Sequence, residues 1–157
     1  MKKENHYNAG EVTVNTMDHV SEFEKKSIYL LRHAEKLFDS DSMSDVPQHL
    51  RKLFEKGENR STIIEFLTVI AQHAMRPVVR HQPECRCIGA DENVFSNILK
   101  FSHEGMKSEA MILGSLLVKS DHISNLVNKA TTVAFLIAKD LRDHSKAPRP
   151  NYLKHLN

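Results

Sequence analysis

The 157-residue chain contains no tryptophan, two cysteines and five glycines, and it has no apolar run long enough to cross a bilayer. The two cysteines, Cys85 and Cys87, lie too close together for an unstrained disulfide, which excludes a fold held by disulfides. The first fifteen residues, MKKENHYNAGEVTVN, lack the apolar segment of a secretory signal. These absences together predict a cytoplasmic protein with reduced thiols and no membrane association.

Charge of one sign is also scarce. The 22 basic and 20 acidic residues leave a formal net charge of +2, which makes nucleic acid an improbable partner on electrostatic grounds. Apolar residues make up 40% of the chain and charged residues 27%, a balance typical of globular domains. The length suits one domain with a core of its own.

Apolar residues recur at steps of three and four along most of the chain, which indicates amphipathic helices. We therefore predict an all-α, single-domain bundle over residues 17–144, with a flexible segment at 1–16 and a proline-containing tail at 145–157. Thr62 with Glu65 predicts a capping box at the start of the central helix, and Asp91 is expected to cap the next one. The expected elements are five helices at about 20–38, 62–76, 91–104, 106–118 and 121–141, with a short helix at 45–57.

Residues 77–90 form the expected irregular loop of this bundle, and the chemistry of the chain concentrates there. His81, Cys85 and Cys87 supply one imidazole and two thiols, the ligand types that zinc prefers. His73, at the end of the central helix, is the nearest fourth ligand, with His103 or Asp91 as alternatives. We predict a site for zinc or another transition metal at His73, His81, Cys85 and Cys87; idle or buried thiols are the simpler interpretation.

The same loop allows two further interpretations. Arg86 lies between the thiols, with Arg80 and His81 nearby, and these groups are expected to lower a thiol pKa and create a redox-responsive cysteine. Arg76, Arg80 and Arg86 against the single Glu84 also leave a local excess of positive charge. That patch predicts an anion-binding site, and one alternative function is a nucleic-acid-associated regulator.

The stretch LLRHAE, residues 30–35, resembles the first motif of the histidine phosphatase family. The resemblance implies that Arg32 is a phosphate ligand, that His33 is the nucleophile, and that His122 is the second histidine. In that family the motif ends a strand. Here the helical periodicity that starts at Val20 runs through residues 27–38, which predicts a helix with Arg32 and His33 on its solvent-facing side. A phosphatase-like phosphohydrolase is therefore kept as an alternative.

The sequence as a whole predicts a small helical protein with a regulatory or binding role and no catalysis. We expect a homodimer formed through the wide apolar face of residues 123–141 or of the central helix, since two-fold dimers are the commonest oligomers. Another protein partner is compatible with the same surfaces.

Overall fold

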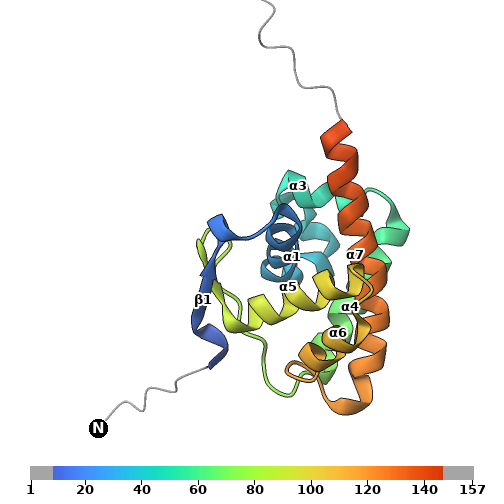
Figure 1. Ribbon diagram of the computed structural model, residues 1–157. Helices are drawn as coiled ribbons and strands as arrows, with labels where there is room; N and C mark the ends of the chain where they lie inside the picture. The colour runs from blue at the N-terminus through green and yellow to red at the C-terminus, as the bar shows by residue number, and fades with distance from the viewer. Residues whose placement is uncertain (1–8, 147–157) are drawn as a thin grey trace, which may run out of the picture.

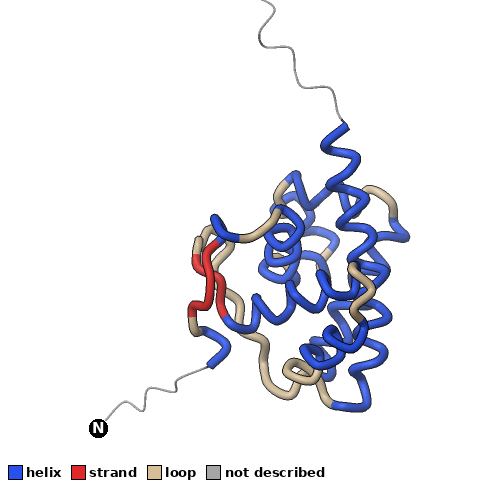
Figure 2. The backbone as a smooth tube through the Cα atoms, in the orientation of Figure 1, coloured by secondary structure: helices blue, strands red, loops and turns tan. Residues whose placement is uncertain are grey.

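The computed structural model describes residues 9–146, and within that range it confirms the all-α fold (Figure 1). A two-stranded sheet at one edge is the only sheet in these residues (Figure 2). The helices are α1 (Glu22–Arg32), α2 (Ala34–Phe38), α3 (Gln48–Arg51), α4 (Gly57–His73), α5 (Ala90–His103), α6 (Lys107–Gly114) and α7 (Ile123–Lys146). The strands are β1 (Thr13–Thr16) and β2 (Cys87–Gly89), and the 3-10 turns are Ala9–Glu11, Met17–His19, Ser40–Asp45, Lys52–Phe54 and Ser120–His122.

The core lies where α5 packs against α1, α6 and α7, and α4 packs against α7. The rings of Phe66 in α4 and Phe95 in α5 meet there, with centroids 5.5 Å apart. The apolar face of α7, which suggested a dimer, is buried inside the chain along Leu126, Val127, Ala130, Val133, Ala134, Ile137 and Ala138. A second subunit would therefore have to use another surface.

A capping box begins α1, but the capping box predicted for α4 is absent. Ser21 and Glu24 form a capping box at α1, with Ser21 N donating to Glu24 Oε2 at 2.9 Å. The capping box predicted at Thr62 is wrong, because α4 already begins at Gly57. Thr62 lies inside the helix, where its hydroxyl donates to the Glu58 carbonyl oxygen at 3.0 Å.

The helix predicted over 20–38 is divided at His33, where α1 ends and α2 begins. Residues 27–31 are helical, as the periodicity predicted, and do not form a strand. The expected solvent exposure of Arg32 and His33 is wrong: the two residues are only 7% and 5% exposed. Arg32 is buried because the loop between α4 and β2 covers its guanidinium.

The N-terminal segment predicted to be flexible is folded over residues 9–16. β1 pairs antiparallel with β2, with Thr13 opposite Gly89 and Thr16 opposite Cys87. Beneath the sheet, Met17, Ile28 and Ile88 form a small apolar cluster. At the other end α7 continues to Lys146, two residues past the predicted boundary, and the rest of the predicted tail (147–157) and residues 1–8 lie outside the described residues.

No helix among residues 9–146 combines the length and apolar character that a membrane span requires.

Candidate functional site

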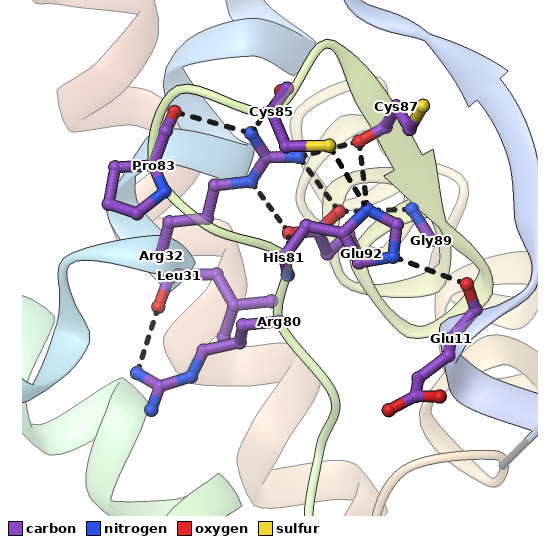
Figure 3. A network of polar contacts seen from close by, with 10 residues as sticks. All are labelled: Glu11, Leu31, Arg32, Arg80, His81, Pro83, Cys85, Cys87, Gly89 and Glu92. Carbon is purple, nitrogen blue, oxygen red and sulfur yellow. Dashed lines mark hydrogen bonds and ion pairs between the residues drawn. The ribbon is translucent and has the colours of Figure 1, made fainter.

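Two neighbouring acids at the start of α5, Asp91 and Glu92, hold the loop that connects α4 to β2. Glu92 is fully buried and accepts four hydrogen bonds: from Arg32 Nε (2.7 Å) and Nη2 (3.0 Å), and from the backbone N–H groups of His81 and Gly89, both at 3.0 Å (Figure 3). Burial by itself raises the pKa of Glu92, but the hydrogen bonds from Arg32, Gly89 and His81 outweigh it and hold the pKa below its ordinary value. Glu92 is thus a charged anchor inside the protein.

Arg32 faces Glu92 from the end of α1, and all five of its N–H groups have an acceptor. Besides the two bonds to Glu92, Nη1 donates to the carbonyl oxygens of Cys85 (2.6 Å) and Pro83 (3.4 Å), and Nη2 donates to the Cys87 oxygen at 2.7 Å (Figure 3). This explains why a charged residue is buried: the loop wraps its guanidinium in carbonyl groups. No N–H of Arg32 remains for a phosphoryl group, the role that the phosphatase resemblance implies.

His33, the nucleophile in that resemblance, is enclosed as well. Its Nδ1 is buried and has no hydrogen-bond partner among the described residues. Burial lowers the pKa of His33, and Lys36 and His49 nearby lower it further. The uncharged form of the ring is therefore favoured.

The imidazole of His81 lies between two backbone carbonyl oxygens. Nδ1 is 3.1 Å from the Cys87 oxygen, and Nε2 is 3.2 Å from the Glu11 oxygen in the N-terminal segment (Figure 3). Only the protonated imidazole has an N–H for each of these acceptors. Burial lowers the pKa of His81, yet the bonds to Cys85, Glu11 and Cys87 and the charge of Glu92 raise it above its ordinary value. A Cβ on Gly89 would lie 3.0 Å from Nε2, so the ring fits because residue 89 has no side chain.

Cys85 lies next to this imidazole, with Sγ 3.7 Å from His81 Nδ1. Hydrogen bonds from the Cys87 backbone N–H, from His81 and from the Cys87 thiol lower the pKa of Cys85, and burial opposes them only in part. The sequence predicted a lowered thiol pKa from Arg86, Arg80 and His81. In the structure His81 has that role together with Cys87, whereas Arg80 and Arg86 pair with Glu35 and Asp18.

The predicted metal ligands divide into two groups. His81, Cys85 and Cys87 come together in the loop, but His73 lies at the end of α4, where its ring stacks on His122 with centroids 3.4 Å apart. The alternative ligands are also occupied, since Asp91 binds Arg76 and Val79 while the ring of His103 contacts Phe23 and Phe135. Within residues 9–146, no three histidine, cysteine or acidic side chains are placed to hold one metal ion.

The three arginines of the predicted anion-binding patch each face a separate carboxylate. Arg76 makes a bidentate pair with Asp91 at 2.8 Å and 2.8 Å, Arg80 pairs with Glu35, and Arg86 pairs with Asp18. Each arginine is thereby neutralised by its own carboxylate. The excess of positive charge counted along the sequence is not an excess in space.

Sequence reasoning missed three residues that build the site, Glu92, Gly10 and Gly89, and it considered Arg32 only as a phosphate ligand or a solvent-facing residue. A Cβ on Gly10 would lie 2.3 Å from Asp91 Oδ2, so the Asp91 carboxylate occupies the space that a side chain at position 10 would need. One signal was available. Glu92 follows Gly89 by three residues at a helix start, the spacing at which a glutamate accepts the N–H of the preceding cap residue.

No family model, curated protein or solved structure matches the chain. The site is therefore interpreted from its own geometry.

Proposed function

We propose that this protein has a regulatory or binding role, without catalysis, and that Cys85 is its responsive group. The supporting observation is the 3.7 Å separation of Cys85 Sγ from His81 Nδ1, in a loop whose backbone Arg32 fixes on both sides of Arg86. A thiolate beside an imidazolium is the arrangement that makes a cysteine nucleophilic at neutral pH. An idle thiol needs no such neighbour.

The proposed reaction is oxidation of Cys85 by hydrogen peroxide. The thiolate sulfur attacks one peroxide oxygen, a sulfur–oxygen bond forms, and the oxygen–oxygen bond breaks. The sulfur loses two electrons to the peroxide, and the departing hydroxide takes a proton from the His81 imidazolium to leave as water. The product, a sulfenic acid at Cys85, changes the charge and the hydrogen bonding of the loop.

The test is the pH dependence of alkylation by iodoacetamide, measured separately at each cysteine by mass spectrometry. Cys85 should react as a thiolate at lower pH than Cys87, and His81→Gln should shift the Cys85 profile to higher pH. Cys87→Ser is the matched control, because serine keeps the backbone N–H and a side-chain donor, so Cys85 should keep its profile. Peroxide should then add one oxygen atom at Cys85 before Cys87. Identical profiles for the two thiols, both typical of a free cysteine, would refute the proposal.

One observation also supports a second candidate, a metal site. In a tetrahedral zinc site a thiolate sulfur and an imidazole nitrogen are about 3.6 Å apart, close to the separation of Cys85 Sγ and His81 Nδ1. Cys87 would supply the third ligand after a change of its side-chain rotamer, and a fourth would come from outside the loop. Protein purified without added metal should then contain near-stoichiometric zinc, lost in Cys85→Ser. If the wild-type protein contains no metal and Cys85 has a low pKa, the metal site is refuted and the reactive thiolate remains the proposed function.

A further inference from the structure

A groove of about 270 Å³ runs beside the loop, between α1 and α2 on one side and α4 with residues 74–80 on the other. Its wall is mainly apolar, and Phe38, 47% exposed, stands in it. The other apolar lining includes Leu31, Leu67, Ile70, Ala71 and Val78. A concave apolar surface of this kind is where proteins take up small ligands, and its volume is just below the range for drug-sized molecules.

Two charged side chains also line the groove, Arg80 and Glu35, and they form an ion pair. They differ in how firmly they are held. Arg80 is 27% exposed and its Nη1 donates to the Leu31 carbonyl oxygen, whereas Glu35 is 83% exposed, on a helix of five residues. Exposed ion pairs contribute little free energy, so the Glu35 carboxylate is readily replaced while the guanidinium stays in position.

We propose that the groove binds a small amphipathic carboxylate, the chemical class of a short fatty acid. The apolar body lies against Leu31, Ile70 and Phe38, and the carboxylate takes the place of Glu35 on Arg80. A guanidinium favours this head group because it offers two parallel N–H donors to a carboxylate. A cationic head group would have only the Glu35 carboxylate, which is 83% exposed to water and already paired with Arg80. This inference stands apart from the chemistry of Cys85, whose side chain does not line the groove.

Octanoate is the probe, titrated into the wild-type protein and followed by backbone amide NMR shifts. Shifts should concentrate on residues 31–38 and 67–80. Octanol, which lacks the charge, octyltrimethylammonium, which reverses it, and acetate, which lacks the apolar body, should each bind at least about tenfold more weakly. Octanol or the ammonium binding as tightly as octanoate would overturn the choice of ligand. An absence of saturable shifts at millimolar octanoate would overturn the site itself.

Four variants locate the site. Ala71→Trp fills the groove from an exposed position of α4 and should abolish binding. Arg80→Gln should weaken octanoate about tenfold, and Glu35→Gln should tighten it, because the competing carboxylate is gone. Arg86→Gln is the matched control: this arginine belongs to the same loop but pairs with Asp18, outside the groove, so affinity should not change.

The Glu35→Gln result keeps the test decisive even where Arg80→Gln disturbs the loop. Tighter binding in Glu35→Gln together with loss in Ala71→Trp supports the proposal. Octanoate binding that survives Ala71→Trp, or that is unchanged in Glu35→Gln, places the ligand elsewhere and refutes it.

Discussion

Asp91 and Glu92 are consecutive residues whose carboxylates both hold the loop, but in different surroundings. Each carboxylate binds one arginine and accepts a backbone N–H of the loop, Val79 for Asp91 and His81 for Glu92. The Arg32 and Glu92 side chains are both 0% exposed, whereas the Asp91 side chain is 5% exposed and its partner Arg76 is 45% exposed. The burial of the arginine is the main difference between the two pairs, and it should change what each pair contributes to stability.

A buried pair is not a large net source of stability, because both ions lose their hydration. Removing one partner is nevertheless costly, since the other is left charged and unpaired in the interior. In the Arg76–Asp91 pair only the arginine is half-exposed, and water can take the place of its guanidinium beside the buried Asp91 carboxylate, which reduces this penalty. Loss of the Arg32–Glu92 pair should therefore prevent the loop from folding. Loss of the Arg76–Asp91 pair should affect only the first residues of the loop.

The largest effect is expected from Arg32→Met. This change leaves Glu92 without its guanidinium and frees the carbonyl groups of Pro83, Cys85 and Cys87, so the free energy of unfolding should fall by about 3–5 kcal/mol in urea denaturation. The double variant Arg32→Met, Glu92→Gln should recover part of this loss, because no buried charge remains. A cost for Arg32→Met no greater than that of Arg76→Gln would contradict the comparison.

Gly10→Ala should have the next largest effect, at the Asp91 side. The new Cβ would meet the Asp91 carboxylate at 2.3–2.9 Å, so one of them must move, at a cost of about 1–3 kcal/mol by the same measurement. Gly57→Ala is the matched control: its Cβ meets nothing within 4 Å at the start of α4, and alanine there should be neutral or stabilising. If both substitutions lower the free energy of unfolding equally, the close contact at Gly10 does not contribute to stability.

Arg76→Gln should cost about 1 kcal/mol or less, and the loss should shrink further in high salt. Asp91 keeps the Val79 N–H at 2.8 Å and gains water where the guanidinium was. The measurement is the urea midpoint at low and at high ionic strength. A salt-independent loss as large as that of Arg32→Met would mean that exposure does not separate the two pairs.

The smallest effect is expected from pH, through His81 on the Glu92 side. Its folded pKa is raised, so its contribution to stability is complete below the unfolded pKa of about 6.5 and is lost as the pH rises through the folded pKa. The stability difference between wild type and His81→Gln should therefore shrink between neutral and alkaline pH. Repeating the series in Cys85→Ser removes the titration of the neighbouring thiol, and a difference that grows with pH there would contradict a raised His81 pKa.

Helical periodicity predicted most of the fold because the core is built from apolar faces that repeat at short range. It failed for Arg32, since the residue that justifies its burial, Glu92, lies sixty positions away along the chain. It also failed for β1, a four-residue strand whose partner comes about seventy residues later. Polar burial and short strands depend on such distant partners, which no local pattern contains.

The candidate site was predicted in part for the same reason. His81, Cys85 and Cys87 are close in sequence, so a local concentration of chemistry was enough to find them. His73 was added by proximity along the chain, but α4 ends where its last turn faces the Ser120–His122 turn, and the ring stacks there on His122. The orientation of a helix end is a property of the packed bundle.

The hydrogen bonds from Arg32 to the loop backbone also affect which substitutions the loop can accept. Arg32 holds residues 83, 85 and 87 by their carbonyl groups, which every amino acid possesses. The conformation of the loop therefore does not depend on the side chains at 84–87. Homologues are expected to vary at positions 84 and 86 while retaining Arg32 and Glu92, and Cys85 is kept for its own chemistry.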